Sequence, residues 1–145
     1  MMPTGTRTDP YRDYNFLVEI DGITQAGFQE VNGLDASTDA IEYREGNDPS
    51  HVRKLPGIHK YSAISLKRGI TDSDELWKWY RTVIDGKTER KNGSIVLLDD
   101  SGQEKIRWNF VNAWPSKWTG PTFNATSNQV AVETLEITHE EVKKV

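Results

Sequence analysis

Apolar residues in this chain recur mainly at every second position, and this alternation restricts the possible folds more than any other feature. The pattern is clearest over 14–20 and 105–114. A period of two places the apolar residues on one face of a β-strand. A helical period is convincing only over 72–84, where one apolar stripe is followed by Gly86. We therefore expect a mainly β fold, an antiparallel β-sandwich or half-barrel with one packed α-helix.

Turn-forming residues divide the alternating pattern into segments. Asp21-Gly22 favours a tight turn, so we expect 14–31 to form one hairpin. Further strands are expected over the segments 35–44, 58–68, 95–98, 105–114 and 129–139. In the last of these the apolar residues change parity, which predicts a bulge near Glu133-Thr134. At the start of the helix, Asp72 and Glu75 have the spacing of a capping box.

One connection is unusually long. Residues 45–57 contain two prolines and two glycines and follow neither period, so we expect a loop between two strands. A loop of this length in a compact domain is typical of a segment with a function or a partner. In the preceding strand, Ile41 and Tyr43 share one face, and the opposite face is small and polar.

The composition excludes several kinds of site. The 145 residues include no cysteine, and the three histidines lack metal-ligand spacing. Neither a nucleophile elbow nor a phosphate loop in the right context is present. We therefore expect no enzyme activity, no cofactor and no metal. The net charge of −4 argues against stable nucleic-acid binding. No apolar run is long enough for membrane insertion, and no export signal is visible.

Tryptophan supports a different kind of site. Trp77 and Trp108 lie on predicted core faces, whereas Trp79, Trp114 and Trp118 are candidates for exposure. Exposed tryptophans suit a subunit interface, and they also suit a monomeric ligand- or sugar-binding β-sandwich. Of these two, we favour the interface. A small hydrolase is a third, less favoured alternative.

Several sequence segments together resemble the contractile-tail inner tube protein family, which includes the tubes of contractile phage tails and of phage-like injection particles. The resemblance covers nearly the whole chain, and the matching segments occur in the same order as in the family. Its main segments are 9–22, 27–34, 42–46, 54–57, 66–69, 76–80 and 128–140. The resemblance implies a single tail-tube domain with a fold related to the tube protein of type VI secretion, which we expect over 14–145. Residues 1–13 mix Gly, Pro, Thr and Asp without an apolar period, so we expect a flexible N-terminal segment there.

The resemblance also implies a function and partners. The chain is expected to be a structural subunit of homo-hexameric rings, whose strands close an oligomeric β-barrel and whose stacking forms a hollow tube. Expected partners are the surrounding sheath, a baseplate or spike initiator, a tube terminator, and DNA or protein cargo in the lumen. Assembly is expected in the cytoplasm, before the tube becomes part of a phage tail or injection particle. The kind of particle is left open.

Two sets of residues follow from this resemblance. The loop is expected to contact the neighbouring ring through Arg44, Glu45, Asp48, Pro49, His51, Arg53, Lys54, Leu55 and Pro56. The small polar strand faces are expected to line the lumen through Thr38, Ala40, Glu42, Ala63, Ser65 and Lys67.

Overall fold

The computed structural model describes residues 15–23, 27–44, 46, 52–126 and 128–145, which form antiparallel strands and one α-helix. The elements in chain order are β1 Phe16–Ile20, β2 Phe28–Asn32, β3 Ser37–Tyr43, β4 Arg53–Lys60, β5 Ile64–Gly69, α1 Glu75–Ile84, β6 Lys91–Leu98, β7 Glu104–Thr119, β8 Val132–Thr138 and β9 Glu141–Lys144. The predicted fold class, mainly antiparallel β with one packed helix, is confirmed.

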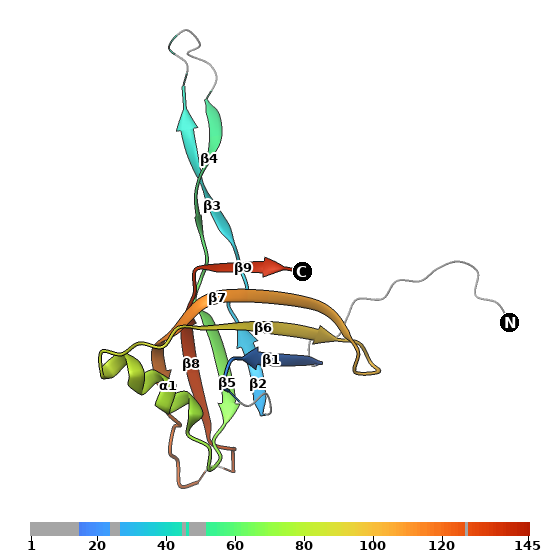
Figure 1. Cartoon of the computed structure of the whole chain (residues 1–145), viewed down its shortest axis with the longest axis vertical. Helices are drawn as coiled ribbons and strands as arrows, with labels where there is room; N and C mark the ends of the chain where they lie inside the picture. The colour runs from blue at the N-terminus through green and yellow to red at the C-terminus, as the bar shows by residue number, and fades with distance from the viewer. Residues whose placement is uncertain (1–14, 24–26, 45, 47–51, 127) are drawn as a thin grey trace, which may run out of the picture.

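The long strand β7 connects two sheets that cross at a steep angle (Figure 1). Its first part pairs with β6 and β9, and β1 extends this group on the far side of β6; we call these strands sheet A. Its second part pairs with β8, which is followed by β5 and β2; we call these strands sheet B. Between the two parts, Asn112 has a φ of 52° and the β6–β7 register shifts. This irregularity lets one strand serve both sheets.

The hydrophobic core lies between the inner faces of the two sheets, and α1 covers one side of it. Its members come from β1, β5, α1, β6, β7 and β8. They are Val18, Ile20, Ile64, Leu66, Leu76, Trp79, Ile95, Phe110, Ala113, Leu135 and Ile137. Gly93 is required where the Phe110 ring crosses β6, because a Cβ there would lie 2.5 Å from the ring. Among the described residues, no helix is long and apolar enough to cross a membrane.

The predicted hairpin over 14–31 is wrong. The turn after β1 forms, since Ile23 N donates to Ile20 O at 3.0 Å, but β1 and β2 do not pair. Instead β1 pairs with β6, and β2 pairs with β5 at the opposite end of the sheet order. Pairing with β6 lets Val18 and Ile20 contribute to the core, and a local turn signal carries no information about this distant partner.

The boundaries of the long loop also differ from the prediction. β4 begins at Arg53, so 53–57 form part of a strand, and the expected strand 58–68 is two strands separated by 61–63. Pro56 lies opposite Ala40 in a two-stranded ribbon. A proline is tolerated in such a strand because its missing N–H can lie on the open edge.

Two details of the helix prediction are also wrong. Asp74, not Asp72, precedes the first helical residue, and it makes no side-chain capping hydrogen bond. Trp79, expected to be exposed, is buried, whereas Trp77, expected in the core, is 37% exposed. The indole Nε1 of Trp79 donates to the Glu89 carbonyl at 2.8 Å, which satisfies its polar atom inside the protein.

The last part of the chain shows two further differences. β7 continues to Thr119 instead of ending near residue 114. β8 pairs with β5 without a register shift, so the predicted bulge near Glu133-Thr134 is absent from this described strand. The parity of β8 is regular because Glu133 points inward, where it is 5% exposed.

A buried ion pair explains how Glu133 can occupy this position. Arg68 Nη2 lies 3.6 Å from Glu133 Oε1, and both side chains are at most 6% exposed. Arg68 Nη1 also donates to Glu75 of α1 at 3.1 Å. The indole of Trp118 donates to the second Glu133 oxygen at 3.1 Å. These contacts join α1, β5, β7 and β8.

We predict that Arg68→Ala lowers the free energy of unfolding by about 3–5 kcal/mol, because it leaves the Glu133 carboxylate buried without its cation. The measurement is denaturant unfolding of dilute subunit. The control is Lys67→Ala, whose exposed ion pair with Glu30 is worth at most about 1 kcal/mol. Equal losses in the two variants would contradict the structural role of the buried pair.

Candidate assembly surfaces

The hairpin of β3 and β4 projects from the body as an arm, defined here as residues 37–44 and 52–60 (Figure 1). Every residue of β3 is exposed, and in β4 every residue except Gly57 is exposed. Within the described chain, β3 and β4 pair only with each other. A two-stranded hairpin without a covering layer is marginally stable in water.

The two faces of the arm differ in chemistry. Ile41 lies opposite Leu55 and Tyr43 lies opposite Arg53, so these four side chains share one face. Ile41, Tyr43 and Leu55 are each about half exposed, at 52%, 48% and 46%. We call this the apolar arm face.

The opposite face is polar or small. Glu42 lies opposite Lys54, Ala40 lies opposite Pro56, and the Thr38 hydroxyl is 2.8 Å from His59 Nδ1. The arm is therefore amphipathic, yet neither of its faces is buried within the subunit.

The root of the arm is fixed by local backbone contacts. Asp35 Oδ1 accepts a hydrogen bond from the Ser62 backbone N–H at 3.0 Å, which links the two connections between arm and body. This hydrogen bond holds the pKa of Asp35 below its usual value. Gly33 has a φ of +97°, and its Cα packs against the Ala63 carbonyl where a Cβ would clash.

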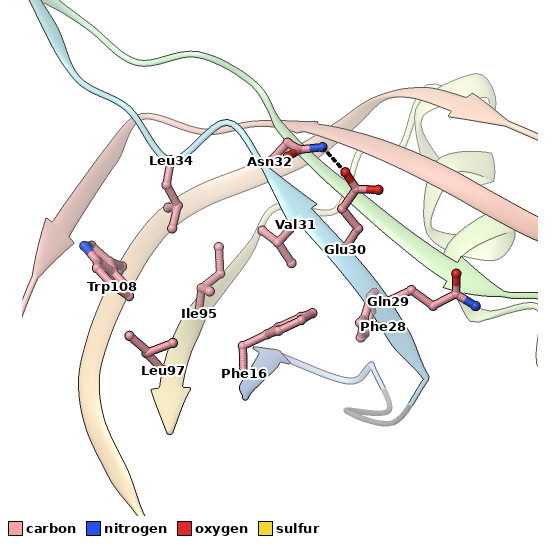
Figure 2. Close-up of a pocket in the computed structure, with 10 residues that line it drawn as sticks. All are labelled: Phe16, Phe28, Gln29, Glu30, Val31, Asn32, Leu34, Ile95, Leu97 and Trp108. Carbon is pink, nitrogen blue, oxygen red and sulfur yellow. Dashed lines mark hydrogen bonds between the residues drawn. The ribbon is translucent and has the colours of Figure 1, made fainter. Parts of the chain in front are cut away.

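A groove of about 540 Å³ opens between β2 and the strands of sheet A (Figure 2). Its apolar lining comes from β1, β2, β6 and β7, and from Leu34 in the connection between β2 and the arm. These residues are Phe16, Phe28, Val31, Leu34, Ile95, Leu97 and Trp108. Gln29, Glu30 and Asn32 add polar groups along β2. The pKa of Glu30 is lowered by its hydrogen bond from Asn32 and by Lys67.

The outer face of sheet B, opposite to the core and to α1, is polar. In β5, Ser65 and Lys67 alternate with the buried Ile64, Leu66 and Arg68. Their neighbours on β2 and β8 are also polar, and Lys67 Nζ lies 3.3 Å from Glu30 Oε2. Directly paired with Ser65 and Lys67 are Glu30, Asn32, Thr134 and Glu136. The sequence pattern does not single out these four residues, and only the strand register reveals them.

The residues expected in the inter-ring loop are only partly described. Arg53, Lys54, Leu55 and Pro56 lie in β4 instead of in a loop, and Arg44 directly follows β3. Glu45, Asp48, Pro49 and His51 lie outside the described residues.

The residues expected to line the lumen lie on two elements. Thr38, Ala40 and Glu42 share the polar face of the arm, whereas Ser65 and Lys67 lie on the outer face of sheet B. Ala63 lies between them in the exposed connection from β4 to β5.

His139, Trp79 and Trp118 make polar contacts inside the subunit. His139 is 8% exposed, and its Nε2 is 3.0 Å from the Ser62 carbonyl oxygen. Among the described residues, no three His, Asp or Glu side chains gather as a metal site would require. Two tryptophans proposed for a sugar platform, Trp79 and Trp118, make hydrogen bonds inside the subunit.

This arrangement, an antiparallel β body with one helix and a projecting hairpin, is the fold of contractile injection system tube proteins. One solved structure with this fold is the sheath-tube complex of the extracellular contractile injection system PVC in its extended state. The chain is 34% identical to its matched protein, with a TM-score of 0.84, over 94% of this chain and 91% of that one. A protein of the PVC sheath/tube terminator structure is 33% identical, with a TM-score of 0.88, over 97% of this chain and 99% of the other.

More distant structures share the fold alone. Hcp1 from Flavobacterium johnsoniae matches with a TM-score of 0.53 and 22% identity, over 88% of this chain and 94% of that one. No match was found among curated proteins. The family model of the T4-like virus tail tube protein gp19 matches residues 12–143. The chain therefore belongs to the gp19 tail tube family and is a structural subunit of a contractile tail tube.

Proposed function

We propose that this subunit forms hexameric rings that stack into a hollow tube, which conducts DNA or protein cargo. The observation that carries the proposal is the exposed arm, whose two strands pair only with each other among the described strands. The two end strands of the order β1-β6-β7-β8-β5-β2 give a second reason. β1 and β2 each have one neighbouring strand among the described strands, so a further strand can add at either edge.

In this proposal the lumen is lined by the polar face of the arm and the outer face of sheet B. The lumen-facing residues are Thr38, Ala40, Glu42, Ala63, Ser65 and Lys67. The outer face of sheet B supports this assignment because its paired residues include charges of both signs, Glu30 and Glu136 against Lys67. A mixed lining offers a moving polymer no continuous patch of opposite charge.

The arm and the segment at its tip would contact the neighbouring ring. The proposed contact residues are Arg44, Glu45, Asp48, Pro49, His51, Arg53, Lys54, Leu55 and Pro56. Residues 14–145 would act as one tail-tube domain, preceded by the N-terminal segment 1–13, which lies outside the described residues. The proposed partners are a sheath outside the tube, a baseplate or spike initiator at one end and a terminator at the other. Subunits would assemble in the cytoplasm and end in a phage tail or injection particle, without enzymatic activity.

The first test is assembly of the purified protein. We expect size exclusion and negative-stain microscopy to detect six-fold rings or tubes in concentrated samples. If initiation is limiting, the same particles should appear once baseplate components are added. A protein that stays monomeric under both conditions would contradict the proposal. That result would favour the alternative of a monomeric ligand- or sugar-binding β-sandwich.

The second test concerns the lumen and uses the absence of cysteine from the chain. We expect Glu42→Cys and Ser65→Cys in assembled tubes to react with a small maleimide but to be protected from a large polymer-linked maleimide. Thr88→Cys is the control, because Thr88 is exposed and closely follows α1, the helix that contributes Leu76 and Trp79 to the core. Equal labelling of Ser65→Cys and Thr88→Cys by the large reagent would place Ser65 outside the lumen. The same comparison tests Glu42 independently.

A further inference from the structure

We infer that the lumen does not select its cargo by charge and that this cargo is polypeptide, a polymer that carries charges of both signs. The inference rests on the proposed function, because it takes the outer face of sheet B as part of the lumen wall, and it adds the class of cargo that this wall fits. It starts from the way in which the charged residues of this face are paired across the strands.

The first charge pair joins β2 and β5. Glu30 lies opposite Lys67, and the distance from Lys67 Nζ to Glu30 Oε2 is 3.3 Å. The side chains are 48% and 40% exposed, so this ion pair faces solvent and does not belong to the core. Two opposite charges at this separation cancel much of each other's field at longer range, and physiological salt screens the remainder within about 8 Å.

The second charge pair joins β8 and β7. Lys117 lies directly opposite Glu136, and residues directly opposite in an antiparallel pair share one face of the sheet. Lys117 is exposed, and the other neighbour of Glu136 is Ser65 of β5. The uncharged side chain of Thr134 lies opposite Lys67, so it separates the first pair from the second.

The charges on this face sum to zero although the chain is acidic. In the described strands of sheet B, the outward-facing charged residues are Glu30, Glu136, Lys67 and Lys117. The whole chain carries a net charge of −4, so its acidic excess lies outside this face. The polar face of the arm repeats the pattern, since Glu42 lies opposite Lys54. The balance is therefore a local property of the proposed lumen wall.

A balanced wall fits a polypeptide better than a nucleic acid. A polynucleotide is a uniform polyanion, and lysine side chains bind its phosphates. A wall that passes such a polymer freely needs an excess of carboxylates, which the described residues of this face do not provide. A polypeptide presents acidic and basic segments in turn, and a wall without net charge retains neither kind.

The test measures how charged peptides react inside assembled tubes. Ser65→Cys and Thr134→Cys report from the wall, beside Glu136 and Lys67 respectively, in a chain that has no other cysteine. Each variant is labelled with a maleimide-capped oligolysine or an oligoglutamate of equal length, and the ratio of the two rates is divided by the ratio at the exposed Thr88→Cys. We expect corrected ratios within about twofold of unity at both sites, because paired charges leave only small local biases of opposite sign.

Charge variants test whether the pairing sets this result. Lys67→Gln leaves Glu30 without its cation, so the oligolysine should label Ser65→Cys several-fold faster than the oligoglutamate, and high salt should reduce this preference. Glu30→Gln, the reciprocal variant, should reverse the preference. Lys78→Gln is the matched control, because it breaks the exposed 3.2 Å ion pair with Asp74 on α1 and changes the net charge by the same amount. Its ratio should equal that of tubes without a charge substitution.

Several results would overturn the inference. Faster labelling by oligolysine at both sites in tubes without a charge substitution would indicate an acidic wall, of the kind that suits DNA. Faster labelling by oligoglutamate, shared by a maleimide-capped oligodeoxynucleotide, would indicate a wall that attracts polyanions. Ratios for Lys67→Gln and Glu30→Gln that both equal the Lys78→Gln ratio would mean that this ion pair does not set the charge of the lumen.

Failure of the proposed function would look different. If the unsubstituted protein forms no tubes in the presence of baseplate components, the tube proposal is rejected, and the inference with it. If tubes form but the large polymer-linked maleimide labels Ser65→Cys and Thr88→Cys equally, the lumen assignment of sheet B is rejected. A neutral or charged labelling ratio is interpreted only in tubes that pass both of these checks.

Discussion

The architecture depends on the continuity of β7 through its bend. Its first part pairs with β6 and β9, its second part pairs with β8, and α1 packs against it. The irregular backbone at Asn112 changes the strand direction without ending the strand. Because both sheets share this strand, their inner faces are held at a fixed angle around Phe110 and Ala113, and a single core serves the whole body.

The elements of this body could be predicted largely from the sequence, but their pairing could not. Alternation records which face of a strand is buried, so the strand character of β1, β6 and the first part of β7 is readable locally. A partner strand leaves no comparable local signal. The turn at Asp21-Gly22 forms as expected, yet β1 continues into a pairing with β6 because that position completes the core.

Particular residues explain why some features of β8, β4 and the groove were not predicted correctly. Glu133 occupies an inward position of β8, where the alternating pattern predicts an apolar residue. A carboxylate can be buried there because it pairs with Arg68, whose position is set by the fold. Pro56 and Gly57 made a strand look like a loop, although a ribbon with an open edge tolerates both. The groove was not predictable at all, since its lining comes from four strands and a connection distant in sequence.

The amphipathic arm has a thermodynamic consequence for assembly. A two-stranded ribbon without a covering layer is only marginally stable, so in the proposed tube part of the binding free energy would be used to hold the arm in its paired form. Each weak contact then becomes persistent only when several form together around a growing end. In the proposed tube this behaviour would produce a critical concentration, below which subunits remain dispersed, and nucleation would become the step at which a cell controls when tubes appear.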